Sequence, residues 1–140
     1  MTESPSCSIT AQSDPVNLVI FGATGDLAMR KIYPALASLC QNNLLSHDTR
    51  ILAVGRKDLT GEQYHNLLGE KLAGVIPPSC LADLAPRVRY LRLDPDETDA
   101  GYTLSTALVE LDGETQKNRL FYLAVLPTAY IPLATTLGEA

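Results

Sequence analysis

The sequence of 140 residues has no tryptophan, two phenylalanines and three cysteines. Cys7, Cys40 and Cys80 are odd in number and far apart, which excludes a small disulfide framework and a zinc site of closely paired cysteines. This cysteine usage favours a reduced, cytoplasmic protein without a metal site. No apolar run approaches the roughly 20 residues needed to cross a bilayer, so we expect no membrane span.

Positive charge is also scarce, because 11 lysines and arginines stand against 16 aspartates and glutamates, for a formal net charge of −5. The basic residues are scattered, so the sequence lacks the basic stripe of a nucleic-acid binder. Residues 1–15 have neither a basic start nor an apolar run, and we expect them to form a flexible tail rather than a signal peptide or an anchor. A hydrophobic content of 46% is enough for a single globular domain over residues 16–140.

Four short runs rich in apolar residues predict strands that are buried in a sheet. Each has the length of a strand, and each later run stops at a glycine or just before a proline. They cover residues 16–21, 51–54, 88–93 and 120–125.

Helical spacing separates these runs, over residues 26–40, 61–73 and 97–111. In the first of these segments, one face is predicted to pack on the sheet and carries Ala28, Ile32, Ala35, Leu36 and Leu39. Pro34 cannot donate to the carbonyl of Arg30, which predicts a kink or a tightened first turn.

The ends of the other two helices have their own signals. Thr60, followed by Gln63, indicates a cap for the second helix, and the third is expected to open with an acidic turn.

Alternating strands and helices predict right-handed βαβ units in an α/β architecture. We expect a Rossmann-type doubly wound parallel sheet, with ligands at the carboxyl ends of the strands. Only four strands are visible, so the sheet is expected to be incomplete, truncated after the fourth strand.

A glycine turn lies where the first strand meets the first helix. Glycines in such a turn allow the backbone to approach a pyrophosphate, and the helix start offers amides and a favourable dipole. A small residue, Ala28, follows where helix and strand must pack closely. The residues predicted to form this dinucleotide loop are Gly22, Ala23, Thr24, Gly25, Asp26 and Leu27.

The second strand is followed by Gly55, Arg56 and Lys57, where an NAD-specific domain commonly carries an acid for the ribose 2′-hydroxyl. Two cations without a carboxylate favour NADP. Arg56 can give phosphate a planar two-point contact, and Lys57 adds a point charge or faces solvent.

The string FGATGDLAMRKIYPAL, residues 21–36, resembles the amino-terminal signature of glucose-6-phosphate dehydrogenases, as do Gly55-Arg56 and the segment FYLA at residues 121–124. The resemblance implies NADP-dependent oxidation of glucose 6-phosphate at C1, the first oxidative step of the pentose phosphate pathway, by a homo-oligomeric enzyme. It also implies that Arg56 meets the 2′-phosphate, that Asp94 lies near the adenine side, and that Lys31 holds the sugar phosphate.

Two departures from this family pattern stand out. Leu126 precedes Pro127 where the family has paired prolines, and the family's segments with the catalytic histidine do not occur. We therefore expect no catalytic residue in this chain, with His47 and His65 as ordinary surface or boundary residues. An atypical short-chain reductase and a non-catalytic NADP sensor remain as alternatives.

Overall fold

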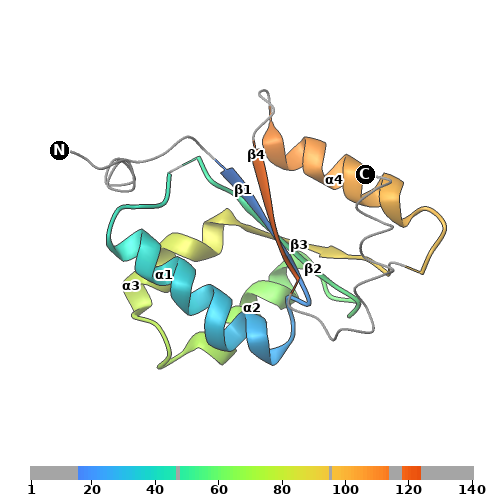
Figure 1. The fold of residues 1–140 in the computed structure, drawn as a ribbon. Coiled ribbons are helices and arrows are strands. Elements are labelled where there is room, and N and C mark those ends of the chain that lie inside the picture. The colour runs from blue at the N-terminus through green and yellow to red at the C-terminus, as the bar shows by residue number, and fades with distance from the viewer. Residues whose placement is uncertain (1–15, 47, 95, 114–117, 124–140) are drawn as a thin grey trace.

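The computed structural model describes residues 16–46, 48–94, 96–113 and 118–123. Within them the strands β1 (Val16–Phe21), β2 (Ile51–Gly55), β3 (Val88–Arg92) and β4 (Asn118–Leu123) form one parallel sheet. The sheet order is β3-β2-β1-β4 (Figure 1). The chain thus moves outward from β1 to β3 and then crosses back to place β4 on the other side of β1. The carboxyl ends of β1 and β4 flank the point at which the strand order reverses, where open α/β sheets bind ligands.

Helices cover both faces of the sheet (Figure 1). One face packs against the π segment η2 (Ala28–Ile32) and helices α1 (Tyr33–Gln41), α2 (Gly61–Leu72) and α3 (Pro78–Leu84), and the other against α4 (Ala100–Asp112). A short 3-10 turn, η3 (Ala85–Arg87), leads into β3. The predicted doubly wound α/β sheet is therefore confirmed for the described strands.

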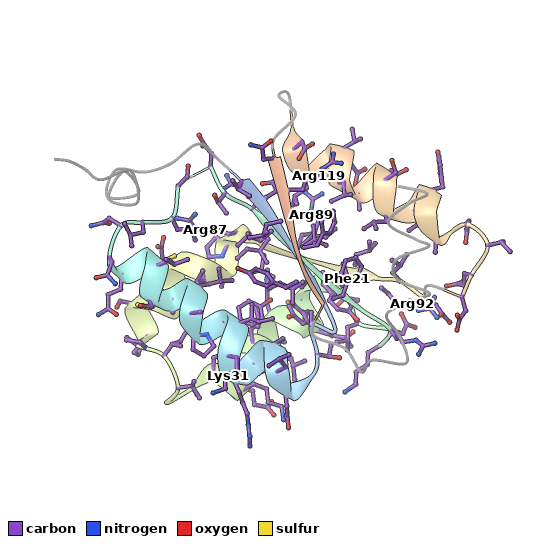
Figure 2. The ribbon with its side chains drawn as sticks, viewed as in Figure 1. Phe21, Lys31, Arg87, Arg89, Arg92 and Arg119 are labelled. Carbon is purple, nitrogen blue, oxygen red and sulfur yellow. The ribbon has the colours of Figure 1, made fainter. Side chains whose placement is uncertain are left out.

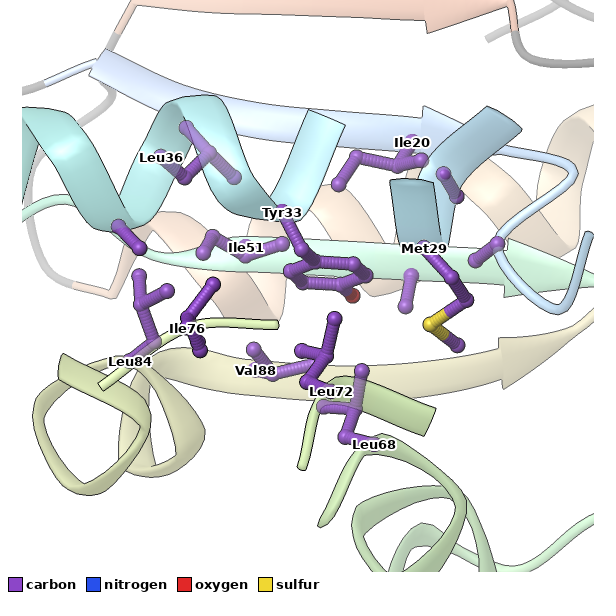
Figure 3. Close-up of a cluster of buried hydrophobic side chains, with 14 of the residues drawn as sticks. Ile20, Met29, Tyr33, Leu36, Ile51, Leu68, Leu72, Ile76, Leu84 and Val88 are labelled. Carbon is purple, nitrogen blue, oxygen red and sulfur yellow. The ribbon is translucent and has the colours of Figure 1, made fainter. Parts of the chain in front are cut away.

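Alternate residues of each buried strand face opposite cores. From β1, Leu18 and Ile20 join the larger cluster drawn in Figure 3, whereas Val19 and Phe21 join the cluster under α4. The central strands β1 and β2 are buried almost throughout, which is why they appear in the sequence as continuous apolar runs rather than alternating ones.

The first helix departs from its predicted geometry. The Tyr33 amide donates to the carbonyl of Ala28, five residues back, so the turn before Pro34 is widened rather than tightened. A wider turn accommodates a proline that can neither donate to the Arg30 carbonyl nor pack closely against it. It also inserts one residue into the helical repeat, so the predicted face was partly wrong: Leu36 is buried as predicted, but Ala35 and Leu39 are exposed, and Tyr33 and Ala37 are buried in their place.

The other predictions of helices and strands hold with local corrections. Thr60 and Gln63 form the expected capping box at the start of α2. The acidic opening turn of the third predicted helix was wrong, because α4 begins only at Ala100 and the acids precede it. β4 starts two residues before the predicted run, and residues 124–125 lie outside the described part. Helix α3 was missed because its seven residues, which begin at the second of two consecutive prolines, are too few to show a period.

A buried polar cluster ties β1 to its neighbours. The Asn17 amide donates to Asp112 at 2.7 Å, its oxygen accepts from the Arg50 amide at 3.1 Å, and Arg119 of β4 pairs with Asp112 at 2.8 Å. Figure 2 labels Arg119 beside the carboxyl-terminal part of α4.

In the part of the chain that the structure describes, no helix is long and apolar enough to span a membrane.

Candidate functional site

The predicted glycine turn lies at the carboxyl end of β1. Gly22 has a φ of 78°, in the left-handed region that side chains disfavour, and its amide donates to the Val54 carbonyl of β2 at 3.0 Å. The Ala23 amide donates to the same carbonyl at 3.1 Å, and the Gly25 amide closes the turn on the Gly22 carbonyl at 3.0 Å. These bonds anchor the turn to the sheet.

The donors of the turn divide into two groups. The amides of Gly22, Ala23 and Gly25 bond within the fold, so the turn offers a ligand the amide of Thr24 and those of the first helical turn. A Cβ built on Gly25 would come 3.3 Å from the Gly22 carbonyl oxygen, so even a methyl group would press on the turn. The glycines, the helix start and the small Ala28 therefore fit a dinucleotide pyrophosphate.

The end of β2 closes against this turn. A Cβ on Gly55 would lie 2.8 Å from the hydroxyl oxygen of Tyr90 and 3.5 Å from Cγ2 of Thr24, so only glycine fits between them. The Tyr90 hydroxyl donates to the Lys57 carbonyl at 2.6 Å. The glycine turn and the loop after β2, separate in the sequence, are thus brought together in one site.

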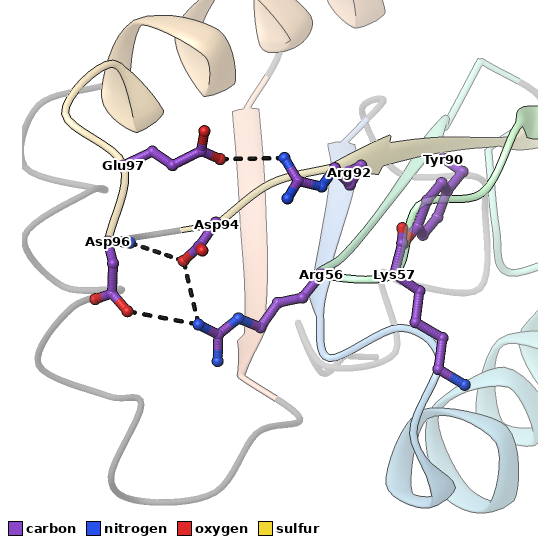
Figure 4. A network of polar contacts seen from close by, with 7 residues as sticks. All are labelled: Arg56, Lys57, Tyr90, Arg92, Asp94, Asp96 and Glu97. Atoms are coloured by element: carbon purple, nitrogen blue, oxygen red, sulfur yellow. Dashed lines mark hydrogen bonds and ion pairs between the residues drawn. The ribbon is translucent and has the colours of Figure 1, made fainter.

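Arg56 lies at the end of β2, but two acids from the loop after β3 contact it (Figure 4). Its guanidinium is 3.2 Å from the Asp94 carboxylate and 3.5 Å from that of Asp96. These acids supply the negative charge that the end of β2 itself lacks. Reasoning from the sequence placed Asp94 near the site and missed Asp96, which no spacing links to Arg56.

The pKa of the Asp94 carboxyl is held below its ordinary value, first by the hydrogen bond from the Asp96 amide at 3.0 Å and then by the Arg56 charge. The carboxylate is therefore charged throughout the neutral range. Arg56 and Asp96 are both largely exposed, at 67% and 69% of their side-chain surface, so their pairing is a weak surface contact that another anion can replace.

The other predicted cations are less constrained. The Lys57 side chain is exposed and extends away from Arg56 in Figure 4, while its carbonyl is the group that Tyr90 holds. Lys31 is an exposed residue of η2, labelled in Figure 2, in the helical segment that follows the glycine turn. Asp26 and Leu27 are also exposed at the start of this helix.

The remaining residues of interest lie elsewhere. His65 contacts the Val88 carbonyl through Nε2 at 2.8 Å, which fits the predicted boundary role. His47, Leu126 and Pro127 lie outside the described residues. Cys40 and Cys80 are free thiols, and burial raises the pKa of Cys40 to about 11.

Two tyrosines behind the turn were missed by sequence reasoning. Tyr64 of α2 donates its hydroxyl to the Ala23 carbonyl at 2.8 Å, and the Tyr33 hydroxyl lies 2.8 Å from that of Tyr64. Both rings are almost fully buried. The only available signal was the spacing of Tyr64 with Leu68 and Leu72 on one side of a helix, where a buried hydroxyl needs a partner. Tyr33 lay outside the predicted face of the first helix and gave no such signal.

Comparison with known proteins identifies similar sequences over most of the chain. A family described as "Glucose-6-phosphate dehydrogenase, NAD binding domain" matches residues 19–140. Glucose-6-phosphate 1-dehydrogenase of Treponema pallidum is 37% identical over 131 residues, 89% of this chain and 25% of that protein. A protein of Arabidopsis thaliana named "Inactive glucose-6-phosphate 1-dehydrogenase 4, chloroplastic" is 31% identical over 127 residues, 87% of this chain and 20% of that protein.

Solved structures give the same result. A structure titled "Glucose-6-phosphate dehydrogenase in complex with its substrate glucose-6-phosphate" matches with a TM-score of 0.79 and 27% identity, over 92% of this chain and 28% of that one. A glucose-6-phosphate 1-dehydrogenase from Mycobacterium avium matches with a TM-score of 0.74 and 26% identity, over 91% of this chain and 27% of that one. This chain thus spans about a quarter of the length of these solved structures.

Proposed function

This chain belongs to the glucose-6-phosphate dehydrogenase NAD binding domain family, and we propose that it binds NADP as the cofactor-binding part of an enzyme that oxidises glucose 6-phosphate at C1. The product of that reaction is the 6-phosphoglucono lactone, and the reduced cofactor is NADPH. The observation that carries the proposal is the junction of the Gly22–Gly25 turn with Gly55 and Arg56, at the carboxyl edge of the sheet.

The residues of this chain bind and orient the cofactor. The Thr24 amide and the first-turn amides face the pyrophosphate, and the positive end of the helix dipole favours its charge. Arg56 leaves Asp96 to hold the 2′-phosphate, a dianion that offers a stronger, two-point partner. When bound, NADP supplies the acceptor for the hydride that leaves C1.

Lys31 is proposed to meet the substrate rather than the cofactor. It is an exposed cation that follows the glycine turn along the helix, so its flexible side chain can reach a phosphate next to the nicotinamide. A structural relative whose title names a complex with its substrate glucose 6-phosphate supports that sugar phosphate as the ligand.

Homo-oligomerisation of the whole protein, its cytoplasmic location and its place in the pentose phosphate pathway belong to the same proposal.

A second function is favoured by the name of one relative. The Arabidopsis protein called inactive is 31% identical to this chain, the same value as for two relatives that are named glucose-6-phosphate 1-dehydrogenase without that word. Membership of the family therefore leaves room for a protein that binds NADP without turning over the sugar phosphate.

Two measurements on the intact protein distinguish these functions. Titration with NADP tests the binding site, and the rise of NADPH absorbance with glucose 6-phosphate tests the reaction. We expect saturable binding and turnover that both disappear in Gly25→Val, whose side chain would press on the Gly22 carbonyl. Binding without turnover supports the sensor, and the absence of binding contradicts both functions.

A further inference from the structure

We propose that Tyr64 is a positioning residue for the dinucleotide turn, and that its hydroxyl, supported by that of Tyr33, sets the direction of the Thr24 amide that meets the pyrophosphate. This inference rests on the proposed binding of a dinucleotide. It assigns a role to two buried tyrosines that contribute no atom to the surface of the site.

The geometry begins at the Ala23 carbonyl. This group accepts a hydrogen bond from the Tyr64 hydroxyl at 2.8 Å, on the buried side of the turn. A trans peptide is planar, with its carbonyl and its amide pointing in opposite directions. No described peptide bond is cis. Fixing the Ala23 carbonyl toward Tyr64 therefore fixes the Thr24 amide away from the core.

The Thr24 amide matters because its neighbours are committed elsewhere. The amides of Gly22 and Ala23 share the Val54 carbonyl, and that of Gly25 bonds to Gly22. Within the turn, the Thr24 backbone amide therefore remains to donate to a ligand. A rotated Ala23–Thr24 peptide would present a carbonyl oxygen to the anion instead of an amide, and would replace attraction by repulsion.

The two hydroxyls have a defined direction of donation. The single proton of Tyr64 is directed to Ala23, so Tyr33 donates to the Tyr64 oxygen across 2.8 Å. Burial raises the pKa of both phenols, so both remain protonated at neutral pH. The Tyr64 ring is itself held by stacking on Tyr90, with centroids 4.7 Å apart. Helices α1 and α2 and strand β3 thus all help to orient one peptide.

Single-atom substitutions in the intact protein test the role. Tyr64→Phe removes the hydroxyl and keeps the ring that stacks on Tyr90, whereas Tyr33→Phe removes only the supporting donor. We expect the Kd for NADP to rise about threefold to tenfold in Tyr64→Phe and about twofold in Tyr33→Phe, the effect of one lost hydrogen bond. At saturating NADP, kcat should be unchanged. Tyr102→Phe, on an exposed tyrosine of α4, is the matched control and should bind as the wild type does.

A purely structural role predicts a different result. Tyr64→Phe would then lower the melting temperature but leave the Kd for NADP unchanged wherever the variant is folded, and this result would overturn the proposal. If Tyr64→Phe does not fold, Tyr33→Phe and amide exchange in the wild type take its place. We expect NADP to slow exchange at the Thr24 amide, and unaltered exchange at saturation overturns the proposal. Failure of the wild type to bind NADP at all would instead contradict the proposed function.

Discussion

The guanidinium of Arg56 lies 3.2 Å from the carboxylate of Asp94, across the gap between the ends of β2 and β3. The pair joins a residue that suits the 2′-phosphate of NADP to an acid that would repel it. Under the proposed function, cofactor preference at this site is a competition between carboxylates and phosphate for one arginine, and both partners can be tested.

Arg56→Ala should weaken the binding of NADP by about 1.5 to 3 kcal/mol, the range of hydrogen bonds to charged groups, and barely affect NAD. The reason is that only NADP carries the 2′-phosphate. Titration of the intact protein with both cofactors measures the difference. Lys57→Ala is the control, with a smaller loss because its side chain extends away from Arg56. Equal losses for NADP and NAD would show that Arg56 does not recognise the phosphate.

The Asp94 contact makes stability depend on acidity. Its folded-state pKa is lowered from 3.8, so the unfolded chain takes up the proton first as the pH falls. The contribution of Asp94 to the free energy of unfolding is therefore fully present above pH 4 and is lost as the pH falls through the lowered pKa. Denaturant titrations between pH 5 and pH 2 should show a shallower acid dependence for Asp94→Asn than for the wild type. If the free energy of unfolding depends on pH in the same way in Asp94→Asn and in the wild type, Asp94 does not contribute to the acid dependence of stability.

Lys31→Ala should depress turnover of glucose 6-phosphate much more than it changes the affinity for NADP. The reason is that the variant lacks the positive charge that is proposed to hold the substrate phosphate. Steady-state kinetics with varied sugar phosphate, together with a separate cofactor titration, measures both effects. Arg30→Ala, on the preceding exposed cation, is the matched control. Unchanged kinetics in Lys31→Ala would make this lysine an ordinary solvent-facing residue.

Asp112→Ala should lower the free energy of unfolding by about 3 kcal/mol, because it leaves the partly buried Arg119 without its charge partner. Asn17 would lose a hydrogen bond in the same variant. Glu110→Ala is the control: Glu110 pairs with Arg89 at 3.7 Å, both side chains are exposed, and its loss should cost less than about 1 kcal/mol. Denaturant unfolding measures both variants. Equal losses of unfolding free energy in Asp112→Ala and Glu110→Ala would contradict the prediction that the buried pair contributes more than the exposed one.

The polypeptide of residues 1–140 by itself should not turn over glucose 6-phosphate. Hydride transfer needs a base at the C1 hydroxyl, and the predicted site residues include none. The assay follows NADPH absorbance with saturating substrate. Reproducible turnover that is lost in Gly25→Val would show that this segment contains catalytic residues.

The sequence by itself determined the fold class and the place of the glycine turn between the first strand and the first helix. Continuous apolar runs predict strands buried on both faces, and two glycines between a strand and a helix predict a phosphate turn, since these signals are local and depend only on neighbouring residues. The capping box at Thr60 and Gln63 was predictable for the same reason. The family resemblance rested on such a local string and agrees with the family that matches the chain.

The tertiary structure alone decided which distant side chains meet. Pro34 signalled an irregular helix, but packing selected the widened turn that buries Tyr33 and leaves Leu39 exposed. The contacts of Arg56 with Asp94 and of Tyr64 with Ala23 join residues 38 and 41 positions apart. Such pairs depend on strand order and on the packing of helices against the sheet, which no short window of sequence contains.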